Sequence, residues 1–251
     1  YMSTLEWKGE EYNEGQITER QFAIKSGKKP VPGIIWTPEV SNGPIPLVLF
    51  GHGGSGHKRV ARSLMLGRRL AGVSQFAMAA IDGPAHGDRK GPGEYNQNTA
   101  MTEGSVDQVI GGMVEDWCAT LGHLTSLGTI DGGRVAYAGF SMGTRFGIPF
   151  VATAGDSLRC AALGKNALET KDPSRVSASA GPRLQIDAPK IRLPVLFHMQ
   201  WDDELFSRES QCALFDLIAS EDKRLIAYPG PHGTSTPEAV DQWCRFIEDN
   251  I

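Results

Sequence analysis

The feature that most constrains the fold is an alternation between short, continuous apolar runs and stretches with helical periodicity. Such runs are typical of strands that are buried on both faces of a parallel sheet. We expect strands of this kind at residues 46–50, 75–81, 134–140, 193–199 and 223–229. Between them, apolar side chains recur at the 3.6-residue period of a helix, most clearly at 106–124 and 240–251. Strands that alternate with helices predict an α/β fold with a mostly parallel central sheet and helices on both faces.

Other segments are predicted from local signals. Residues 16–38 have the pattern of a β-hairpin, and residues 58–71 that of a helix. Thr236 followed by Pro237 predicts the start of the last helix, because threonine is a good N-cap and proline suits the first helical position. The long connection at 164–192 contains three prolines and is expected to form either a small lid or a solvated loop.

Composition and charge exclude several classes of function. The 251 residues are 40% hydrophobic, which is ample for a sizeable core, and carry a formal net charge of −4 without a basic stripe. We therefore expect no nucleic-acid partner. No apolar stretch approaches the roughly 20 residues needed to span a bilayer, and the polar N-terminus lacks the features of a signal peptide, so we expect no membrane association and a cytoplasmic location. The four cysteines are widely spaced and form no C-x-x-C motif, which favours free thiols over a metal finger or a redox pair.

One serine stands in a distinctive place, between glycines and directly after the predicted strand at 134–140. The segment Gly139-Phe140-Ser141-Met142-Gly143 matches the G-x-S-x-G pattern of a nucleophile at a sharp strand-to-helix turn. Side chains two residues before and after the serine would collide, so glycine is used at both places. The helix that follows directs free N–H groups towards an oxyanion, although Pro149 is expected to end or kink it within two turns.

A glycine-rich loop follows the strand at 46–50. In "LVLFGHGGSGHK", His52-Gly53-Gly54-Ser55-Gly56 could let backbone donors approach a developing oxyanion closely. A phosphate-cradling turn and a plain tight turn are the alternatives for this loop alone, but neither common phosphate-loop spacing is present. We expect His52 to brace the loop, whereas His57 could face either the site or water.

With these motifs in order, the sequence resembles the α/β-hydrolase family. The resemblance is carried by "HGGSG", "IDGPAHGDR", "GFSMG", "HMQWDDELF" and "PGPHGTS", and thus extends over residues 47–235. Within the family, the sequence resembles the compact dienelactone-hydrolase-like esterases and carboxylesterases. The resemblance implies one α/β-hydrolase domain over residues 1–251 and a serine esterase that forms an acyl-enzyme.

The family order of nucleophile, acid and histidine implies the site residues. Ser141 is then the nucleophile, and His232, the only histidine after the acids, is the general base. The family pattern places the acid three residues before an apolar residue. Leu205 fits that role for Asp202, which we favour over Asp203, while Glu204 is a weaker candidate. The backbone N–H groups of Met142 and Gly54 are expected to form the oxyanion hole.

The remaining polar residues are expected to have structural roles. Asp82, His86 and Asp88 have a spacing that matches no strong metal signature, so we predict no metal site and no cofactor. His198 is expected to pack within the core. The predicted partner is a small-molecule ester, and the oligomeric state is not predicted. A peptidase or amidase of the same fold, and a non-catalytic ligand-binding protein, are the alternative functions.

Overall fold

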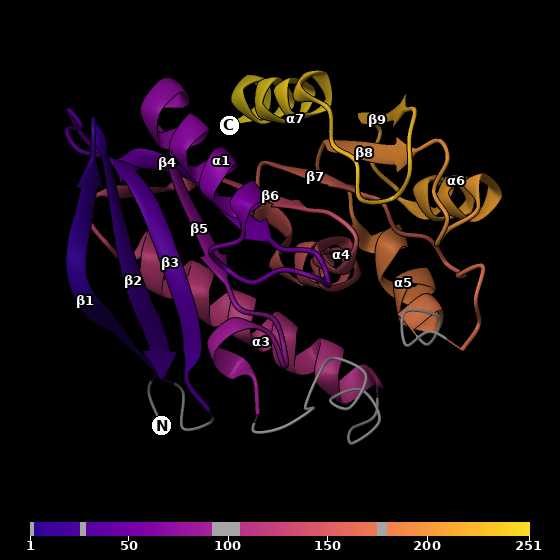
Figure 1. Cartoon of the computed structure of the whole chain (residues 1–251), viewed down its shortest axis with the longest axis horizontal. Helices are drawn as coiled ribbons and strands as arrows, with labels where there is room; N and C mark the ends of the chain where they lie inside the picture. The colour runs from indigo at the N-terminus through magenta and orange to yellow at the C-terminus, as the bar shows by residue number, and fades with distance from the viewer. Residues whose placement is uncertain (1–2, 26–28, 92–105, 175–179) are drawn as a thin grey trace.

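The computed structural model describes residues 3–25, 29–91, 106–174 and 180–251. These residues form a nine-stranded sheet with the strand order β1-β2-β3-β5-β4-β6-β7-β8-β9. The first three strands and β5 pair in antiparallel fashion, and every later neighbour in the sheet is parallel. The predicted mostly parallel sheet is therefore confirmed (Figure 1).

The strands are β1 (Thr4–Glu14), β2 (Ile17–Lys25), β3 (Val31–Pro38), β4 (Ile45–Gly51), β5 (Ala77–Ile81), β6 (Ile130–Gly139), β7 (Cys160–Gly164), β8 (Val195–Gln200) and β9 (Lys223–Tyr228). The helices are α1 (Ala61–Arg69), α3 (Val106–Thr125), α4 (Met142–Ala154), α5 (Gly181–Asp187), α6 (Arg208–Leu217) and α7 (Pro237–Asn250).

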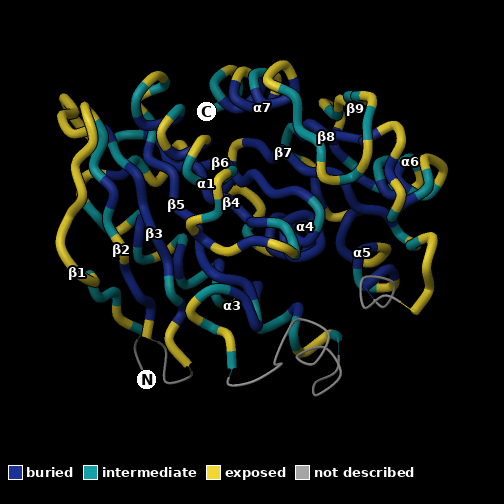
Figure 2. Tube along the Cα trace, in the orientation of Figure 1, coloured by how far each residue is buried: buried dark blue, intermediate teal, exposed yellow. Residues whose placement is uncertain are grey.

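Helices cover both faces of the sheet because the central strands are apolar on both sides. Along β4, Leu47 and Leu49 join the core beneath α3, α4, α5 and α6, whereas Val48 and Phe50 join the core beneath α1 and α7. Strands β4, β5, β7 and β8 are buried along nearly all of their length and β6 along its second half, whereas β1 is largely exposed (Figure 2). This two-sided burial is what the continuous apolar runs predict.

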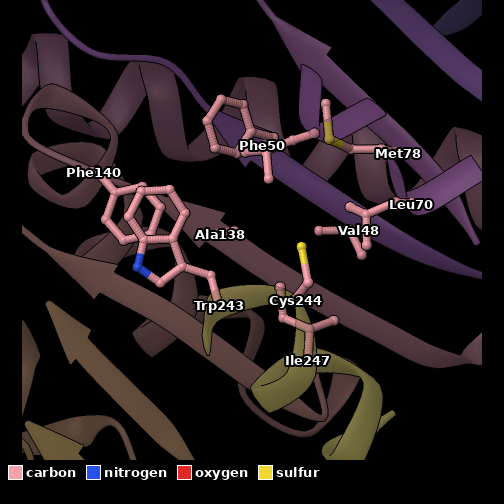
Figure 3. A pocket seen from close by; sticks show the side chains of 10 residues that line it. Val48, Phe50, Leu70, Met78, Ala138, Phe140, Trp243, Cys244 and Ile247 are labelled. Atoms are coloured by element: carbon pink, nitrogen blue, oxygen red, sulfur yellow. The ribbon is translucent and has the colours of Figure 1, made fainter. Parts of the chain in front are cut away.

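The core beneath α7 holds the strand end that precedes Ser141. Phe140 stacks on Trp243, with ring centroids 3.9 Å apart, and eight further apolar or sulfur-bearing side chains surround this contact (Figure 3). The remaining gap measures only about 10 Å³, so an apolar site of this size has no room for a ligand. This packing fixes the end of β6 against α7.

Two strands were not predicted. β1 lies at the edge of the sheet and is largely exposed, so its side chains are mostly polar and it lacks the continuous apolar run of a buried strand. β7 contains only Cys160-Ala161-Ala162-Leu163-Gly164, whose small side chains give a weak strand signal. The predicted 58–71 helix is present as α1, followed by a π-helical turn at Leu70–Ser74. The expected capping of α7 is confirmed, because the Thr236 side chain accepts the Ala239 N–H.

Of the two effects expected of Pro149, to end or to kink the helix after Ser141, the first is contradicted. Helix α4 continues through it to Ala154, and every residue from Met142 to Val151 is buried. A proline inside a helix costs about 3 kcal/mol or more, through the lost hydrogen bond and a steric clash. Burial of a nearly all-apolar helix against the sheet offsets that cost, so tertiary packing overrides the local signal.

Where it is described, the 164–192 connection is partly the expected solvated loop, since residues 171–174 are exposed, and partly a packed helix. It contains α5, whose Leu184 is fully buried in the core and which packs against α4. Residues 175–179 lie outside the described part of the chain. The first residues of the connection, Lys165, Asn166 and Ala167, are buried next to Ser141 and have roles that are described below.

Candidate active site

The site is built at the carboxyl ends of the parallel strands, where α/β sheets place their ligands. Ser141 stands between β6 and α4 with φ of 60° and ψ of −117°. A non-glycine residue in this conformation is strained, at a cost of order 1–3 kcal/mol, and such strain is common at functional sites. The turn predicted from the G-x-S-x-G pattern is therefore present.

Two glycines allow this turn, although a collision between side chains at 139 and 143 is not what excludes a Cβ at either position. A Cβ on Gly143 would lie 2.2 Å from the carbonyl oxygen of Gly51 on the neighbouring strand β4. A Cβ on Gly139 would lie 2.8 Å from the carbonyl oxygen of Gly143. The Tyr137 hydroxyl fills the remaining space and donates to that same Gly143 oxygen at 2.7 Å.

The main chain of Ser141 is tied to the end of β7. Its N–H donates to the carbonyl oxygen of Gly164 at 3.0 Å. Its own carbonyl oxygen accepts the Nδ2–H of Asn166 at 2.8 Å. Asn166 is 2% exposed, and its other amide atom accepts the Ala167 N–H. Sequence reasoning missed Asn166 because β7 itself was not predicted.

Three side chains meet in a hydrogen-bonded line. His232 Nε2 lies 2.9 Å from Ser141 Oγ, and His232 Nδ1 lies 2.8 Å from Asp203 Oδ2. The other oxygen of Asp203 accepts the N–H groups of Leu205 and Phe206 at 2.8 and 3.1 Å. Because an ionised carboxylate only accepts, the imidazole proton is assigned to Nδ1, and Nε2 is free to accept the serine proton.

The acid in this line is Asp203, and the choice of Asp202 is corrected. The Asp202 side chain is 57% exposed, and its Oδ2 accepts the Gly230 N–H at 2.9 Å. The apolar residue three positions after the acid is Phe206, which is buried and lies against the His232 ring at 5.6 Å between centroids. Leu205 suggested Asp202 only because two apolar residues stand side by side.

The third acid also binds the loop that carries His232. Glu204 accepts the N–H of His232 at 2.8 Å, and this hydrogen bond holds the pKa of Glu204 below its usual value. Together with the Asp202–Gly230 contact, it joins the loop after β8 to the loop after β9. Consecutive acids in "WDDE" thus orient both the ring and the main chain of His232.

We define residues 229–235, which carry His232, as the histidine loop. Two cationic side chains donate hydrogen bonds to this loop. Lys165 is 1% exposed, and its Nζ donates to the carbonyl oxygens of His232, at 3.3 Å, and Thr234. Burial lowers the pKa of Lys165 to about 7. Arg62, from α1, donates to the Gly233 carbonyl oxygen at 3.2 Å. Neither residue was predicted, since no motif marks them.

A chain of buried hydrogen bonds leads to the start of the histidine loop. Trp243 Nε1–H donates to His198 Nδ1 at 3.1 Å, so the His198 proton is on Nε2, which faces Gln200 Oε1 at 3.0 Å. Gln200 in turn donates to the Pro229 carbonyl oxygen at 2.7 Å. Burial lowers the pKa of His198 to about 4. The expected packing role of His198 is confirmed.

The glycine-rich loop after β4 is braced by histidines. His52 Nε2 accepts the Gly83 N–H at 2.9 Å, so Nδ1–H donates to the Gly53 carbonyl oxygen at 2.8 Å. Burial lowers the pKa of His52 to about 4 and keeps the ring neutral. His86 Nε2 lies 2.8 Å from the Gly54 carbonyl oxygen. The bracing role predicted for His52 is confirmed.

The oxyanion-hole donors remain a prediction. Met142 opens α4 and Gly54 stands in the loop after β4, and no hydrogen bond found within the described residues uses the N–H of either. His57, for which two orientations were open, is exposed and accepts the Arg59 N–H at 3.2 Å.

The turn at 82–88 is structural. Asp82 is fully buried and accepts both the Nζ and the backbone N–H of Lys58 at 2.8 Å, as well as the Asp88 N–H at 2.9 Å. Within the described ranges, no cluster of His, Cys, Asp and Glu side chains could hold a metal ion. All four cysteines are free thiols, as predicted. In the described part of the chain no helix has the length and hydropathy for a bilayer span, and the compartment stays a prediction.

Neither the family models nor the curated proteins contain a match. Among solved structures, the chain is similar to a PEG-bound cold-adapted esterase from an Arctic intertidal metagenomic library, with 29% identity and a TM-score of 0.82 over 98% of this chain and 99% of that one.

Two further structures share the fold at lower identity. Acetyl xylan esterase 1 from Thermoanaerobacterium sp. JW/SL YS485 is 15% identical, with a TM-score of 0.75 over 99% of this chain and 88% of that one. A dienelactone hydrolase-like promiscuous phosphotriesterase from metagenomic libraries is 21% identical, with a TM-score of 0.71 over 93% and 97%. The similarity thus extends over nearly the whole chain.

Proposed function

Since this chain is an α/β-hydrolase of the esterase type, and hence a carboxylic ester hydrolase, we propose that it cleaves small-molecule esters through a Ser141-His232-Asp203 triad and a covalent acyl-enzyme. The observation that carries the proposal is the unbroken line of hydrogen bonds from Ser141 Oγ through both ring nitrogens of His232 to Asp203. A strained turn presents the serine, which supports a role as nucleophile.

In the proposed reaction, Ser141 Oγ attacks the acyl carbon while His232 Nε2 takes its proton. Asp203 holds Nδ1–H and stabilises the imidazolium that forms. The carbonyl electrons move onto oxygen, and the N–H groups of Met142 and Gly54 stabilise this oxyanion. When the intermediate collapses, the ester C–O bond breaks and His232 gives its proton to the departing alcohol.

Deacylation repeats these steps with water. His232 Nε2 takes a proton from water, whose oxygen attacks the acyl carbon of the acyl-enzyme, and the proton then returns to Ser141 Oγ as the carboxylic acid leaves. The chain's own residues carry every proton in this scheme, so the prediction that no cofactor is required follows from the mechanism.

The test is the hydrolysis of p-nitrophenyl esters of increasing acyl length by the native protein and Ser141→Ala. We expect kcat to fall by about 10⁴-fold or more in the variant. An organophosphonate should add one phosphonyl group to the native protein and none to Ser141→Ala. Ser126→Ala, which removes an exposed hydroxyl at the end of α3, should behave as native. Full activity in Ser141→Ala would refute the proposal.

The amidase alternative is tested in the same assay. The triad geometry suits both acyl-oxygen and acyl-nitrogen cleavage, and the leaving group decides between them. When rates are measured side by side on p-nitrophenyl esters and matched p-nitroanilides, the rate on the ester should be much higher. Comparable rates would instead support the peptidase or amidase function.

A further inference from the structure

Apart from the Phe206 ring that lies against His232, the histidine loop has little apolar packing. None of residues 229–235 is buried, although the loop carries the proposed general base. The loop also contains Pro229, Gly230, Pro231 and Gly233 and forms no helix or strand. The position of His232 therefore depends on hydrogen bonds that reach the loop from neighbouring elements.

Lys165 makes the most extensive of these contacts from the core side. Its Nζ donates to the carbonyl oxygens of His232 and Thr234 and to Ser235 Oγ at 3.0 Å. An ammonium group has three N–H donors, and here each has an oxygen acceptor within the loop. One buried side chain thus contacts His232 itself and two residues that follow it.

The backbone directs Lys165 towards the loop. Lys165 follows Gly164 at the end of β7 and has φ of 50°, in the left-handed region that lysine seldom adopts. Its N–H donates to the His198 carbonyl oxygen on β8 at 2.8 Å. The next residue, Asn166, binds the carbonyl oxygen of Ser141. Consecutive side chains at this strand end thus support the nucleophile and the histidine.

Stability alone does not explain a lysine at this position. Within the described residues, Lys165 forms no ion pair with a carboxylate; the charge of Arg62 disfavours its protonated form, and the charge of Asp203 favours it. Burial of an amine without an ion pair is costly, and an apolar side chain would avoid that cost. A buried and strained lysine without an ion pair is instead expected where function requires its donors.

We propose that Lys165 is a positioning residue for His232, which holds the main chain of the histidine loop so that Nε2 stays within reach of Ser141. The inference rests on the proposed triad mechanism and extends it. Lys165 acts through the loop and does not itself touch the reacting atoms. Its loss should therefore change the rate of the chemical step more than the binding of the ester.

The primary experiment compares Lys165→Met with the native protein on a p-nitrophenyl ester. We expect kcat to fall about 10- to 100-fold, since a displacement of about 1 Å at a catalytic group has an effect of this size. KM should stay within about twofold, because the ester pocket keeps its side chains. The downfield proton NMR signal of His232 Nδ1–H, assigned by its loss in Asp203→Asn, should shift or broaden.

Lys223→Met is a matched control. Lys223 Nζ also donates to three main-chain carbonyl oxygens, those of Phe215, Asp216 and Ile218, but at the start of β9, the opposite end of that strand from the site. Its substitution should lower the thermal midpoint and leave kcat and the His232 signal unchanged. An equal loss of kcat in both variants would overturn the inference, because general destabilisation would then explain it.

The remaining outcomes separate this inference from the proposed function. If Ser141→Ala is inactive while Lys165→Met keeps kcat within twofold of native, the triad stands and the positioning role is wrong. If Lys165→Met does not fold, Ser235→Ala removes one acceptor and should lower kcat about 2- to 10-fold, the range of one ordinary hydrogen bond. Native kcat in a folded Ser235→Ala would then overturn the inference.

Discussion

Asp203 Oδ2 lies 2.8 Å from His232 Nδ1, and the Asp203 side chain is only 1% exposed. Its second oxygen accepts two backbone N–H groups, so the carboxylate has no freedom to turn away from the imidazole. Asp202, one residue earlier, accepts the Gly230 N–H and faces solvent. Two adjacent acids of the same type therefore act on different parts of the histidine loop.

The first prediction compares Asp203→Asn with Asp202→Asn. An amide at 203 can donate to Nδ1 and favour the wrong imidazole tautomer, so we expect kcat to fall by about 10⁴-fold, as in serine proteases with the equivalent change. Asp202→Asn keeps an oxygen for Gly230 and should keep kcat within about threefold. Steady-state kcat values on one p-nitrophenyl ester test this prediction. A larger loss of kcat in Asp202→Asn than in Asp203→Asn would contradict the assignment of Asp203 as the triad acid.

The second prediction concerns the turn at Ser141. In Gly143→Ala, the new Cβ would lie 2.2 Å from the Gly51 carbonyl oxygen, and a backbone atom cannot yield as a flexible side chain can. Either β4 or α4 must shift, so we expect reduced stability together with a loss of phosphonate labelling at Ser141. Thermal unfolding and the labelling rate measure the two effects.

Gly122→Ala is the control for Gly143→Ala. Gly122 lies on α3, and a Cβ there would meet no atom within 4 Å. Alanine in a helix is favoured over glycine by roughly 0.5–1 kcal/mol, so this variant should be slightly more stable and fully active. If Gly143→Ala were equally well tolerated, the steric account of the turn would be wrong.

The sequence predicted the parallel strands and the Ser141 turn because both follow from local patterns. Apolar runs identify buried strands, and the G-x-S-x-G pattern identifies the turn, although the atom that a Cβ on Gly143 would meet belongs to Gly51 on β4. The choice of acid failed for a physical reason. Asp202 and Asp203 have the same chemistry, and only the burial of Phe206 and the direction of the chain after β8 distinguish them.

Lys165 and Asn166 could not be predicted for a related reason. Their roles depend on β7, a five-residue strand of small side chains whose register beside β6 and β8 places its end next to Ser141. Their partners lie 67 and 25 residues away along the chain. No periodicity or motif encodes a contact between residues so distant, so such support becomes visible only in the fold.

The third prediction is a loss of stability in acid that involves His198. Burial lowers its pKa to about 4, whereas the ordinary value is 6.5. Between these values the unfolded chain binds a proton that the native state does not, so stability falls as the pH falls from 6.5 to about 4. One such histidine contributes a slope of about 1.4 kcal/mol per pH unit.

Denaturant unfolding between pH 7 and 4.5 tests this prediction. His198→Asn should be less stable at pH 7, because Trp243 Nε1–H and Gln200 lose a well-placed partner. The free energy of unfolding of this variant should nevertheless depend less steeply on pH than that of the native protein. The difference in slope should correspond to the uptake of one proton on unfolding. An unchanged slope would mean that His198 is not held neutral in the folded state.

The last prediction is an alkaline limb in the pH profile of kcat. Burial lowers the pKa of Lys165 from 10.5 to about 7. The positive charge of Arg62 lowers this pKa further, whereas the negative charge of Asp203 raises it. Below this pH the ammonium has three N–H donors for its three oxygen acceptors, and above it the amine has two. The charged groups that face Lys165 are Arg62 and Asp203, and His198 on β8 is held neutral by burial.

We therefore expect kcat to fall from about pH 7 upwards and to level off at a lower value, because the loop around His232 is held by fewer hydrogen bonds. A loss of folded protein caused by the titration of Lys165 does not explain this fall in kcat. Between pH 7 and 10.5 the unfolded chain binds the proton that native Lys165 has released, so its titration raises stability with pH. In Lys165→Met no amine titrates there, and the alkaline limb should disappear. Rates from pH 6 to 10, corrected for spontaneous ester hydrolysis, measure this limb, and an alkaline limb that persists in Lys165→Met would contradict the prediction.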